Sequence, residues 1–489
     1  MTEVIVVGAG PTGLTLACEL ALAGIDTLVV ERLPERVEQT KGGTLQPRTQ
    51  ELLEARGLLA PMRARSLART PDGGHFAMLP VPLDGTAWDT DHPCPLAVAQ
   101  GEIEAVLEER ALGLGVTLLR GAAVTAVEQD ADGVTVTTAD GRRITARHLV
   151  ACDGGHSTVR KLLGAAFPGR AGTYTAVLAD VRLSSVSDLV PRAIGHISTL
   201  TREAGGHWVM LVPVGGDRYR FTGGVARPEP ASDAGREKDA PVTFEEIAGP
   251  LRAVYGEETV LAAVDHASRF GDATRQVERY RIGRVFLAGD AAHIHPPFGG
   301  QGLNLGMQDA FNLGWKLAAV LRGKAPEALL DTYHAERHPA GAWVLHITQA
   351  QRVLADPRPT PDVLELREVV TDLLRQPDAN RRMAGLMSGL AHSYAGTGAA
   401  PGAHPLVGRR VAGLDPALFA TGRAVLADLA GILPAGLGAT RAAPVPGLPG
   451  LGAVLVRPDG YAAWAADTGS GAAAPDLDAL AAEACSSLL

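Results

Sequence analysis

One stretch near the N-terminus decides the fold of this chain, Val4-Ile5-Val6-Val7-Gly8-Ala9-Gly10-Pro11-Thr12-Gly13. Its first four residues are apolar and predict a buried strand, and its three glycines follow the spacing GxGxxG. Gly8 allows a tight turn, Gly10 lets a pyrophosphate approach the backbone, and Gly13 lets the next helix pack close to the sheet. The stretch predicts a strand, a phosphate-binding turn and a helix, with a tight turn that binds nothing as the alternative.

The residues that follow complete a unit able to bind a dinucleotide. Pro11 and Thr12 fall in the expected first helical turn, where proline loses no hydrogen bond and free N–H groups can face a phosphate. The helix is predicted to end near Gly24, and Thr27–Val30 reads as a second buried strand. Glu31 closes that strand, in the position suited to bind ribose hydroxyls. The unit fits FAD and NAD equally well.

Composition and charge narrow the class of protein. The chain has 489 residues, 46% of them hydrophobic, which suffices for two or three domains of roughly 150 residues each. The net charge of −9 argues against nucleic acid as a partner, and no apolar run is long enough to cross a membrane. Four scattered cysteines without a CxxC pair argue against a disulfide framework and favour a cytoplasmic location.

The same pattern of buried strands and a helix recurs in later segments of the chain. His148–Cys152 and Val285–Ala288 read as buried strands, and a long helix is predicted from about Leu303 to Leu321. The segment from about Tyr174 to Arg269 is β-rich instead. The sequence therefore predicts an α/β protein in which two domains are interleaved along the chain.

Two acidic residues follow the later strands. Asp153 comes directly after the strand that ends at Cys152, and Asp290 lies two residues beyond Ala288. A carboxylate at the end of such a strand can accept hydrogen bonds from a polyol such as the ribityl chain of FAD. Taken alone, either residue would more often cap a helix or a turn.

Three motifs carry a resemblance to a known family. They are Gly8–Gly13, Ala151–Arg160 and Val285–His293, and two highly specific stretches add to them, Gly289–Asn304 with Gly289-Asp290-Ala291-Ala292-His293, and Leu330–Arg337. In this order and spacing the chain resembles the class A flavoprotein aromatic hydroxylases, the para-hydroxybenzoate hydroxylase fold family, over about residues 3–345. The tail resembles the thioredoxin-like C-terminal domain of the branch that hydroxylates aromatic polyketides, anthracycline-type compounds or rifamycins.

The resemblance implies a fold of three parts. A Rossmann-like FAD-binding domain of the GR2 type is expected in residues 1–75, 97–173 and 270–345, interleaved with a β-sheet substrate domain in 76–96 and 174–269. A helical segment and linker are expected in 346–400, with Gly396–Gly402 as the flexible part. Residues 401–489 are expected to form the thioredoxin-like domain, which lacks a CxxC pair and should be redox-inert.

The resemblance also assigns expected roles to individual residues. Gly8, Gly10 and Gly13, with Pro11 and Thr12, would hold the FAD pyrophosphate, Glu31 the adenosine ribose, and Arg32 would lie near the adenine. Lys41 replaces the arginine usual in the family, which keeps the charge but loses the bidentate fork. The remaining expected cofactor-binding residues are Gln100 and Val124, Asp153 for FAD and NADPH, Asp290 for the ribityl chain, and Gly300, Gln301, Gly302, Leu303 and Asn304 along the flavin ring.

The implied chemistry is that of a single-component monooxygenase. NADPH, or NADH, would reduce non-covalent FAD, and a flavin C4a-hydroperoxide would then hydroxylate a polycyclic aromatic substrate, a polyketide or an antibiotic-like compound, with O₂. The protein would orient its partners and exclude water. No residue stands out as a general base. No metal is predicted, because His293 and His295 form an H-x-H pair without further ligands.

Other functions remain open at this point. The same cofactor could carry out Baeyer–Villiger oxygenation of the same substrate class. A flavin halogenase is disfavoured, because the Trp-x-Trp-x-Ile-Pro signature is missing. From a different class, the chain could be a flavin-containing protein that sequesters its ligand without turnover. The sequence fits a monomer and a homodimer alike, and an aromatic content of 4% predicts a mainly aliphatic substrate pocket.

Overall fold

The protein is described by a computed structural model. It describes residues 2–36, 42–66, 68–69, 73–225, 240–357, 359–395, 403–433, 437–445 and 447–468. Lys41 and the predicted linker Gly396–Gly402 lie outside the described residues.

A six-stranded sheet forms the centre of the largest domain. Its strand order is β18-β19-β10-β1-β2-β6, and all neighbours pair in parallel except the edge strand β18. The three strands predicted at residues 4–7, 27–30 and 148–152 are present, the last ending one residue earlier. The strands are β1 (Val4–Val7), β2 (Thr27–Val30), β6 (Thr117–Leu119), β10 (His148–Ala151), β18 (Arg281–Ile282) and β19 (Val285–Leu287).

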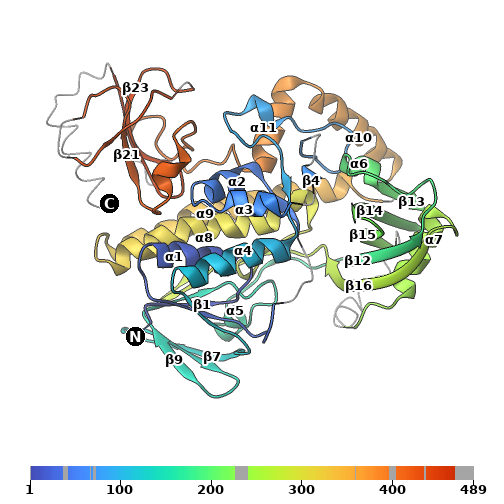
Figure 1. Cartoon of the computed structure of the whole chain (residues 1–489), viewed down its shortest axis with the longest axis horizontal. Coiled ribbons are helices and arrows are strands. Elements are labelled where there is room, and N and C mark those ends of the chain that lie inside the picture. The colour runs from blue at the N-terminus through green and yellow to red at the C-terminus, as the bar shows by residue number, and fades with distance from the viewer. Residues whose placement is uncertain are drawn as a thin grey trace.

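Helices stack above this sheet, as Figure 1 shows for α1, α4, α8 and α9. Helices α1 and α8 touch through glycines: a Cβ on Gly306 would come within 2.4 Å of Oγ1 of Thr12, and one on Gly314 within 2.7 Å of Cβ of Glu19. This close approach brings the two N-termini to the same end of the sheet. The helices of this layer are α1 (Pro11–Leu22), α2 (Pro47–Glu54), α3 (Leu59–Ala64), α4 (Gln100–Gly113), α8 (Gln301–Leu321) and α9 (Asp331–Leu354).

Smaller elements complete this domain. A three-stranded antiparallel sheet and helix α5 (Thr158–Leu162) lie on the far side of the central sheet (Figure 1). Two further three-stranded sheets have the orders β11-β17-β20 and β3-β5-β4. Their strands are β3 (Thr44–Leu45), β4 (Ala68–Arg69), β5 (Leu96–Ala97), β7 (Val124–Gln129), β8 (Val134–Thr138), β9 (Arg143–Ala146), β11 (Gly169–Arg170), β17 (Thr274–Gln276) and β20 (His293–Ile294).

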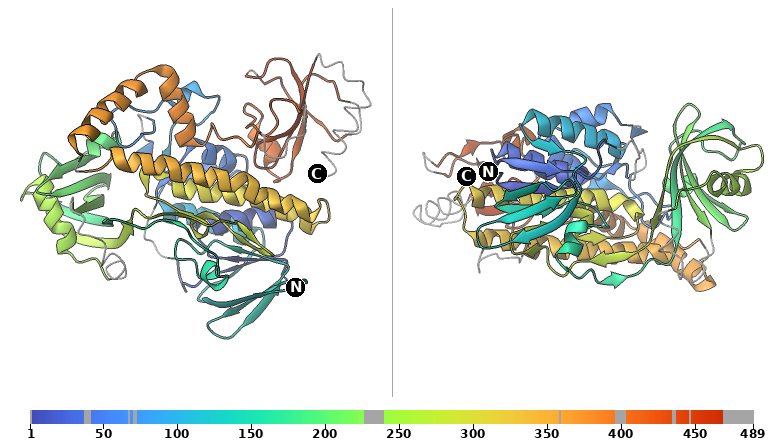
Figure 2. Two further views of the ribbon diagram at one scale, coloured as in Figure 1. Left: turned by 180° about the vertical axis from the view of Figure 1, so that it is seen from behind. Right: turned by 90° about the horizontal axis from the view of Figure 1, so that it is seen from below.

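The β-rich middle segment forms one antiparallel sheet of order β13-β14-β15-β12-β16. Helix α7 (Glu245–Tyr255) packs on one face, where its apolar residues join alternate strand residues in a separate core that includes Val181, Leu211 and Phe221. The views of Figure 2 show that this unit stands apart from the central sheet. Its elements are β12 (Thr175–Ser185), α6 (Ile197–Leu200), β13 (Thr201–Ala204), β14 (His207–Gly215), β15 (Arg218–Val225) and β16 (Val260–Gly271).

The predicted helical segment bridges the two sheets. It comprises the second half of α9, then α10 (Pro361–Leu374) and α11 (Pro377–Ser388). Phe76 and Leu79, which the sequence grouped with the substrate domain, pack against Ile347 of α9 and Met387 of α11. Residues 76–83 therefore share a core with these helices, and the domain boundaries drawn from the sequence stay a proposal.

A separate C-terminal domain is present, with a four-stranded sheet of order β22-β21-β23-β24. β21 and β22 are parallel, while β23 is antiparallel to both β21 and β24, so the sheet is mixed. The strands are β21 (Val425–Asp428), β22 (Thr440–Arg441), β23 (Leu451–Val456) and β24 (Ala462–Asp467).

Buried charges attach this domain to helices α8 and α9 of the largest domain. Arg457 donates to both carboxylate oxygens of Glu336 on α9 at 2.8 Å, and Lys316 of α8 donates to the same carboxylate at 2.7 Å. Asp459 accepts from Arg457 and from Asn312 of α8. Each domain thus contributes an ion pair of its own, Lys316 with Glu336 and Arg457 with Asp459, and the bond between Arg457 and Glu336 joins the two pairs. Among the described residues, no helix has both the length and the apolar character needed to cross a bilayer.

Candidate active site

The three glycines of the glycine-rich turn differ, because two are needed for packing and one faces open space. A Cβ on Gly8 would lie 2.4 Å from the carbonyl oxygen of Cys152, and one on Gly13 would lie 2.0 Å from that of Gly8. A Cβ on Gly10 would meet no atom within 4 Å, and Gly10 lines a cavity with Pro11 and Thr12. Packing alone thus explains Gly8 and Gly13, whereas the open side of Gly10 fits a pyrophosphate at the N-terminus of α1.

Glu31 connects the second strand to this turn. Its Oε2 accepts the N–H of Ala9 at 2.8 Å, and its Oε1 accepts the N–H of Leu33 at 2.9 Å. A carboxylate can accept about four hydrogen bonds, so ribose hydroxyls can still bind beside these two. The neighbouring Arg32 is exposed, as a residue near an adenine edge would be.

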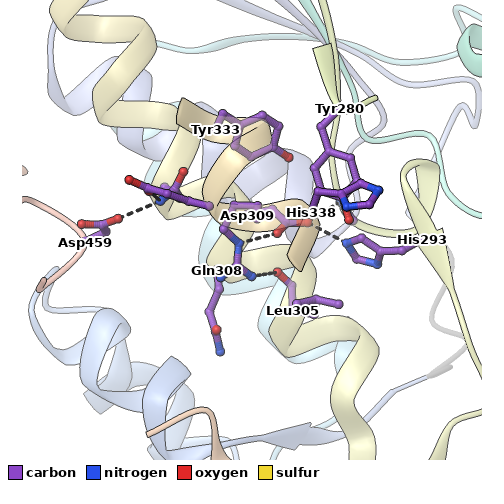
Figure 3. Close-up of polar contacts among 12 residues, drawn as sticks. Tyr280, His293, Leu305, Gln308, Asp309, Tyr333, His338 and Asp459 are labelled. Carbon is purple, nitrogen blue, oxygen red and sulfur yellow. Dashed lines mark hydrogen bonds and ion pairs between the residues drawn. The ribbon is translucent and has the colours of Figure 1, made fainter. Parts of the chain in front are cut away.

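A buried carboxylate fixes the loop that carries Asp290. Asp309 of α8 accepts the N–H of Gly289 at 3.1 Å and lies 2.7 Å from Nε2 of His293 (Figure 3). Arg337 of α9 donates Nε to the other oxygen of Asp309 at 2.7 Å. Burial alone would raise the pKa of Asp309, but Arg337 and then His293 outweigh burial and lower it. The ionised carboxylate holds both ends of the loop and leaves Asp290 on the cavity wall.

The loop before α8 needs glycine both for its backbone conformation and for its packing. Gly299 and Gly300 have φ values of 71° and 62°, and a Cβ on Gly299 would lie 2.3 Å from Cε of Met387. Asn304 donates to the carbonyls of Thr44 and Gly300 at 2.8 Å and accepts the N–H of Gln46 at 2.8 Å. Its amide therefore fastens the loop and does not face the cavity, whereas Gly300, Gln301, Gly302 and Leu303 all line it.

One cavity of about 910 Å³ joins these features. It extends from the turn at Gly10 past Asp290 and the Gly299–Leu303 loop to the middle sheet, where Trp208 and Met210 line it. Its length suits a dinucleotide with a further compartment at the end of the cofactor.

The polar atoms beside the start of α8 test whether FAD fits. His295 donates Nδ1–H to the carbonyl of Pro296 at 2.8 Å, so Nε2 carries a lone pair, and this buried Nε2 has no hydrogen-bond partner among the described residues. A Cβ on Gly302 would lie 3.6 Å from that Nε2 and 3.8 Å from Oδ1 of Asp290. Two acceptors thus face one space that only glycine leaves open, which fits the hydroxyl groups of a ribityl chain.

The other predicted cofactor residues differ in their relation to this cavity. Gln100 lines it, accepts the N–H of Gly42 at 2.9 Å and donates to Glu104. One oxygen of Asp153 caps α5 by accepting the N–H groups of Thr158 and Val159, while its Oδ1 is buried without a partner among the described residues. Val124 packs in the hydrophobic core at the start of β7. These roles stay proposals.

The middle sheet supplies cavity residues that the sequence did not single out. Arg220 on β15 donates to Oδ1 of Asp180 on β12 at 2.8 and 3.0 Å, and Arg220 approaches Gly43 of the FAD domain. Along each strand, residues that line the cavity alternate with residues that pack under α7. This alternation is the sequence pattern that could have identified the cavity residues. The cavity residues on these strands include Leu178, Trp208, Met210, Val212, Arg220 and Thr222.

Two histidines, His75 and His196, also line the cavity with their rings in edge-to-face contact. Burial, and next the neighbouring His196, lowers the pKa of His75 to about 4, so its ring is neutral near pH 7. Nothing in the local pattern around His75 marked it, because it stands alone between loop residues. Within the described part of the chain, no group of three or more His, Cys, Asp or Glu residues is placed to hold a metal ion.

Comparison with known proteins adds independent findings. Residues 1–348 match the family described as FAD binding domain, and residues 418–486 match the one described as aromatic-ring hydroxylase, C-terminal. Anhydrotetracycline monooxygenase of Streptomyces rimosus is 45% identical with 95% of each chain covered, and rifampicin monooxygenase of Streptomyces venezuelae is 41% identical with 96% of each covered. The solved structure of OxyS anhydrotetracycline hydroxylase from Streptomyces rimosus is similar with a TM-score of 0.85 at 44% identity, covering 97% of this chain and 98% of that one.

Proposed function

Because this chain belongs to the family of FAD-binding aromatic-ring hydroxylases and is an FAD-dependent monooxygenase, we propose that it hydroxylates a polycyclic aromatic compound of polyketide or antibiotic type. NADPH is the proposed reductant and O₂ the oxygen source. The single observation that carries the substrate class is the cavity of about 910 Å³, which continues past the proposed flavin loop to the middle sheet.

The residues of this chain would share the work of binding FAD. Gly10 and the N-terminus of α1 would hold the pyrophosphate, while Asp290 and His295 would accept hydrogen bonds from the ribityl chain. The backbone N–H groups at the start of α8, after Gly300, would place a partial positive charge at the flavin edge, where negative charge develops on reduction. When bound, FAD supplies the redox and oxygen chemistry.

The substrate would lie over the flavin, against the middle sheet. Leu178, Met210 and Trp208 give this compartment its apolar wall, which excludes water from the reacting atoms. Arg220, paired with Asp180, sets a fixed charge at the wall near Gly43. Such a charge favours the ionised form of a bound phenol, which is the more electron-rich and therefore more reactive form.

A direct experiment tests this function. The purified protein should be yellow and release FAD on denaturation, and a polycyclic phenol such as anhydrotetracycline should accelerate NADPH oxidation and give a product one oxygen atom heavier. Structure determination of that product separates hydroxylation from Baeyer–Villiger insertion. FAD-loaded protein that binds the compound without faster NADPH oxidation would identify a sequestering protein instead and overturn the proposal.

Two finer points complete the proposal. The buried residues Cys18 and Cys152 are free thiols, which supports work in the reducing cytoplasm. The chain is proposed to act as a monomer or a homodimer.

A further inference from the structure

The turn that carries His75 has an unusual backbone. Ala77 and Met78 have φ values of 51° and 58°, a left-handed conformation that residues with a side chain rarely adopt, and here two such residues are consecutive. Strained conformations persist only where the surroundings enforce them, and they cluster at ligand-binding sites.

The surroundings of this turn do enforce it. Ala77 is buried, and its N–H donates to Oε1 of Gln351 on α9 at 3.1 Å. Phe76 and Leu79 on either side are buried in the core shared with α9 and α11. Contacts with α9 and α11 therefore hold the turn on one side. On the other side, His75 and Met78 line the cavity.

Hydrogen bonding fixes the tautomer of His75. The N–H of Met78 donates to its Nδ1 at 3.4 Å, so in the neutral ring the proton resides on Nε2. No described residue hydrogen-bonds to that Nε2. The ring cannot serve as a base through Nε2, because this nitrogen already carries the proton, but it can donate one hydrogen bond into the cavity.

His196 orients this donor. Its Nδ1 accepts the N–H of Ser198 at the start of α6, and its ring meets that of His75 at 6.5 Å between centroids and 89° between planes. An edge-to-face contact restricts rotation of the His75 ring about its side-chain bonds. His196 is thus a positioning residue for His75.

We propose that His75 binds an oxygen atom of the substrate, a ketone or phenolate oxygen on the polycyclic frame, through its Nε2–H, with His196 holding the ring in place. The proposal rests on the proposed function, and it adds that the substrate must carry an oxygen at the end of the cavity bounded by this turn. A neutral donor suits such an oxygen, because the bond requires no change of protonation on the protein.

The test uses two matched polycyclic probes with the FAD-loaded protein. Anthraquinone-2-sulfonate carries two ketone oxygens that anthracene-2-sulfonate lacks, and equilibrium dialysis gives a Kd for each. One neutral hydrogen bond predicts that the parent binds the quinone about fivefold more tightly. His75→Asn keeps an acceptor for the Met78 N–H and loses the distal donor, so it should reduce the ratio to about one with the Kd of the anthracene probe unchanged.

Two further variants make the result specific. His75→Gln places an amide N–H near the position of Nε2 and should restore part of the preference, even where the Asn variant folds poorly. His346→Asn, at an exposed position on α9, should leave the ratio at the parent value. A preference that persists in both His75 variants, or a parent without preference, would overturn the role of His75 alone. If neither probe binds to parent protein with full FAD content, the polycyclic substrate class fails and this inference falls with it.

Discussion

The carboxylate of Asp309 lies 2.7 Å from Nε2 of His293, and neither side chain has any exposed surface. The same carboxylate pairs with Arg337, so removal of its charge leaves a buried guanidinium without compensation. We expect Asp309→Asn to lower the free energy of unfolding by about 3–5 kcal/mol. The variant should also release FAD faster, because the Gly289–His293 loop loses its anchor.

Urea unfolding and the rate of FAD release measure these two effects separately. Asp331→Asn is the matched control, since Asp331 pairs with Arg281 at an exposed site, where an ion pair contributes at most about 1 kcal/mol. Stability lost to the same extent in both variants would show that the buried pair has no special role.

Two glycines of the N-terminal turn should respond differently to the same substitution. Gly10→Val should fold and lack FAD, because its side chain would enter the open space proposed for the pyrophosphate. Gly13→Val should fail to fold, because a Cβ there would lie 2.0 Å from a backbone carbonyl. Circular dichroism and the absorbance ratio of flavin to protein distinguish the outcomes, and a yellow Gly10→Val protein would place the cofactor elsewhere.

Loss of the cavity carboxylate should disturb coupling between NADPH oxidation and product formation. Asp290→Ala is expected to bind FAD more weakly and to release more hydrogen peroxide per NADPH, because a loosened ribityl chain misplaces the ring and admits water. NADPH, peroxide and product are measured in one reaction. Parent-like FAD affinity together with parent-like coupling would remove Asp290 from the flavin site.

The C-terminal attachment should be as important as a core contact. Arg457→Ala leaves Asp459 buried without a cation and Glu336 with Lys316 as its remaining cation, and we expect a loss of about 3–5 kcal/mol in the free energy of unfolding. Arg441→Ala is the matched control within the same domain, because Arg441 is largely exposed where it pairs with Asp428. Thermal unfolding of both variants provides the comparison, and equal melting temperatures would contradict the expectation.

Acid should destabilise the protein partly through His75. Its pKa is about 4 in the folded state and 6.5 ordinarily, so the unfolded chain takes up the proton first as the pH falls. The stability due to the neutral ring is full above about pH 6.5 and is lost as the pH falls towards 4. Between about pH 7 and pH 5 this amounts to roughly 2 kcal/mol, which His75→Asn should remove from the pH dependence of urea unfolding. An unchanged dependence in that variant would show that His75 is already protonated or exposed.

Local patterns predicted most of the central sheet. The strands at Val4–Val7 and Thr27–Val30 agree residue for residue, because both are short apolar runs bounded by glycine or a charge. Helix α8 begins at Gln301, two residues before the predicted start, because Gly300 in a left-handed conformation ends the loop and the first helical turn tolerates Gly302. Strand β18 was not predicted, since two residues at a sheet edge carry no periodicity.

The residues of the candidate site differ in the same way, because local patterns identify some of them and not others. Gly10 and Asp290 line the cavity and could be singled out from the sequence, because local motifs encode the turns that carry them, while their roles stay predictions. Arg220 and His75 were missed because each becomes a cavity residue only when distant segments meet. Alternation along β15 predicts that the strand has two different faces. Helix α7 packs on one of them, and only this packing decides that the other face lines the cavity.

The position of Arg457 late in the sequence has a consequence for the order of events during synthesis. Chains fold from the N-terminus as they leave the ribosome, so Lys316 and Glu336 emerge more than a hundred residues before the arginine that completes their pairing. Until then Glu336 has Lys316 as its cationic partner, and α8 and α9 lack their contacts with Arg457 and Asp459. A ribosome that stops early therefore leaves behind a flavin domain in which these two helices are without the contacts that join them to the C-terminal domain.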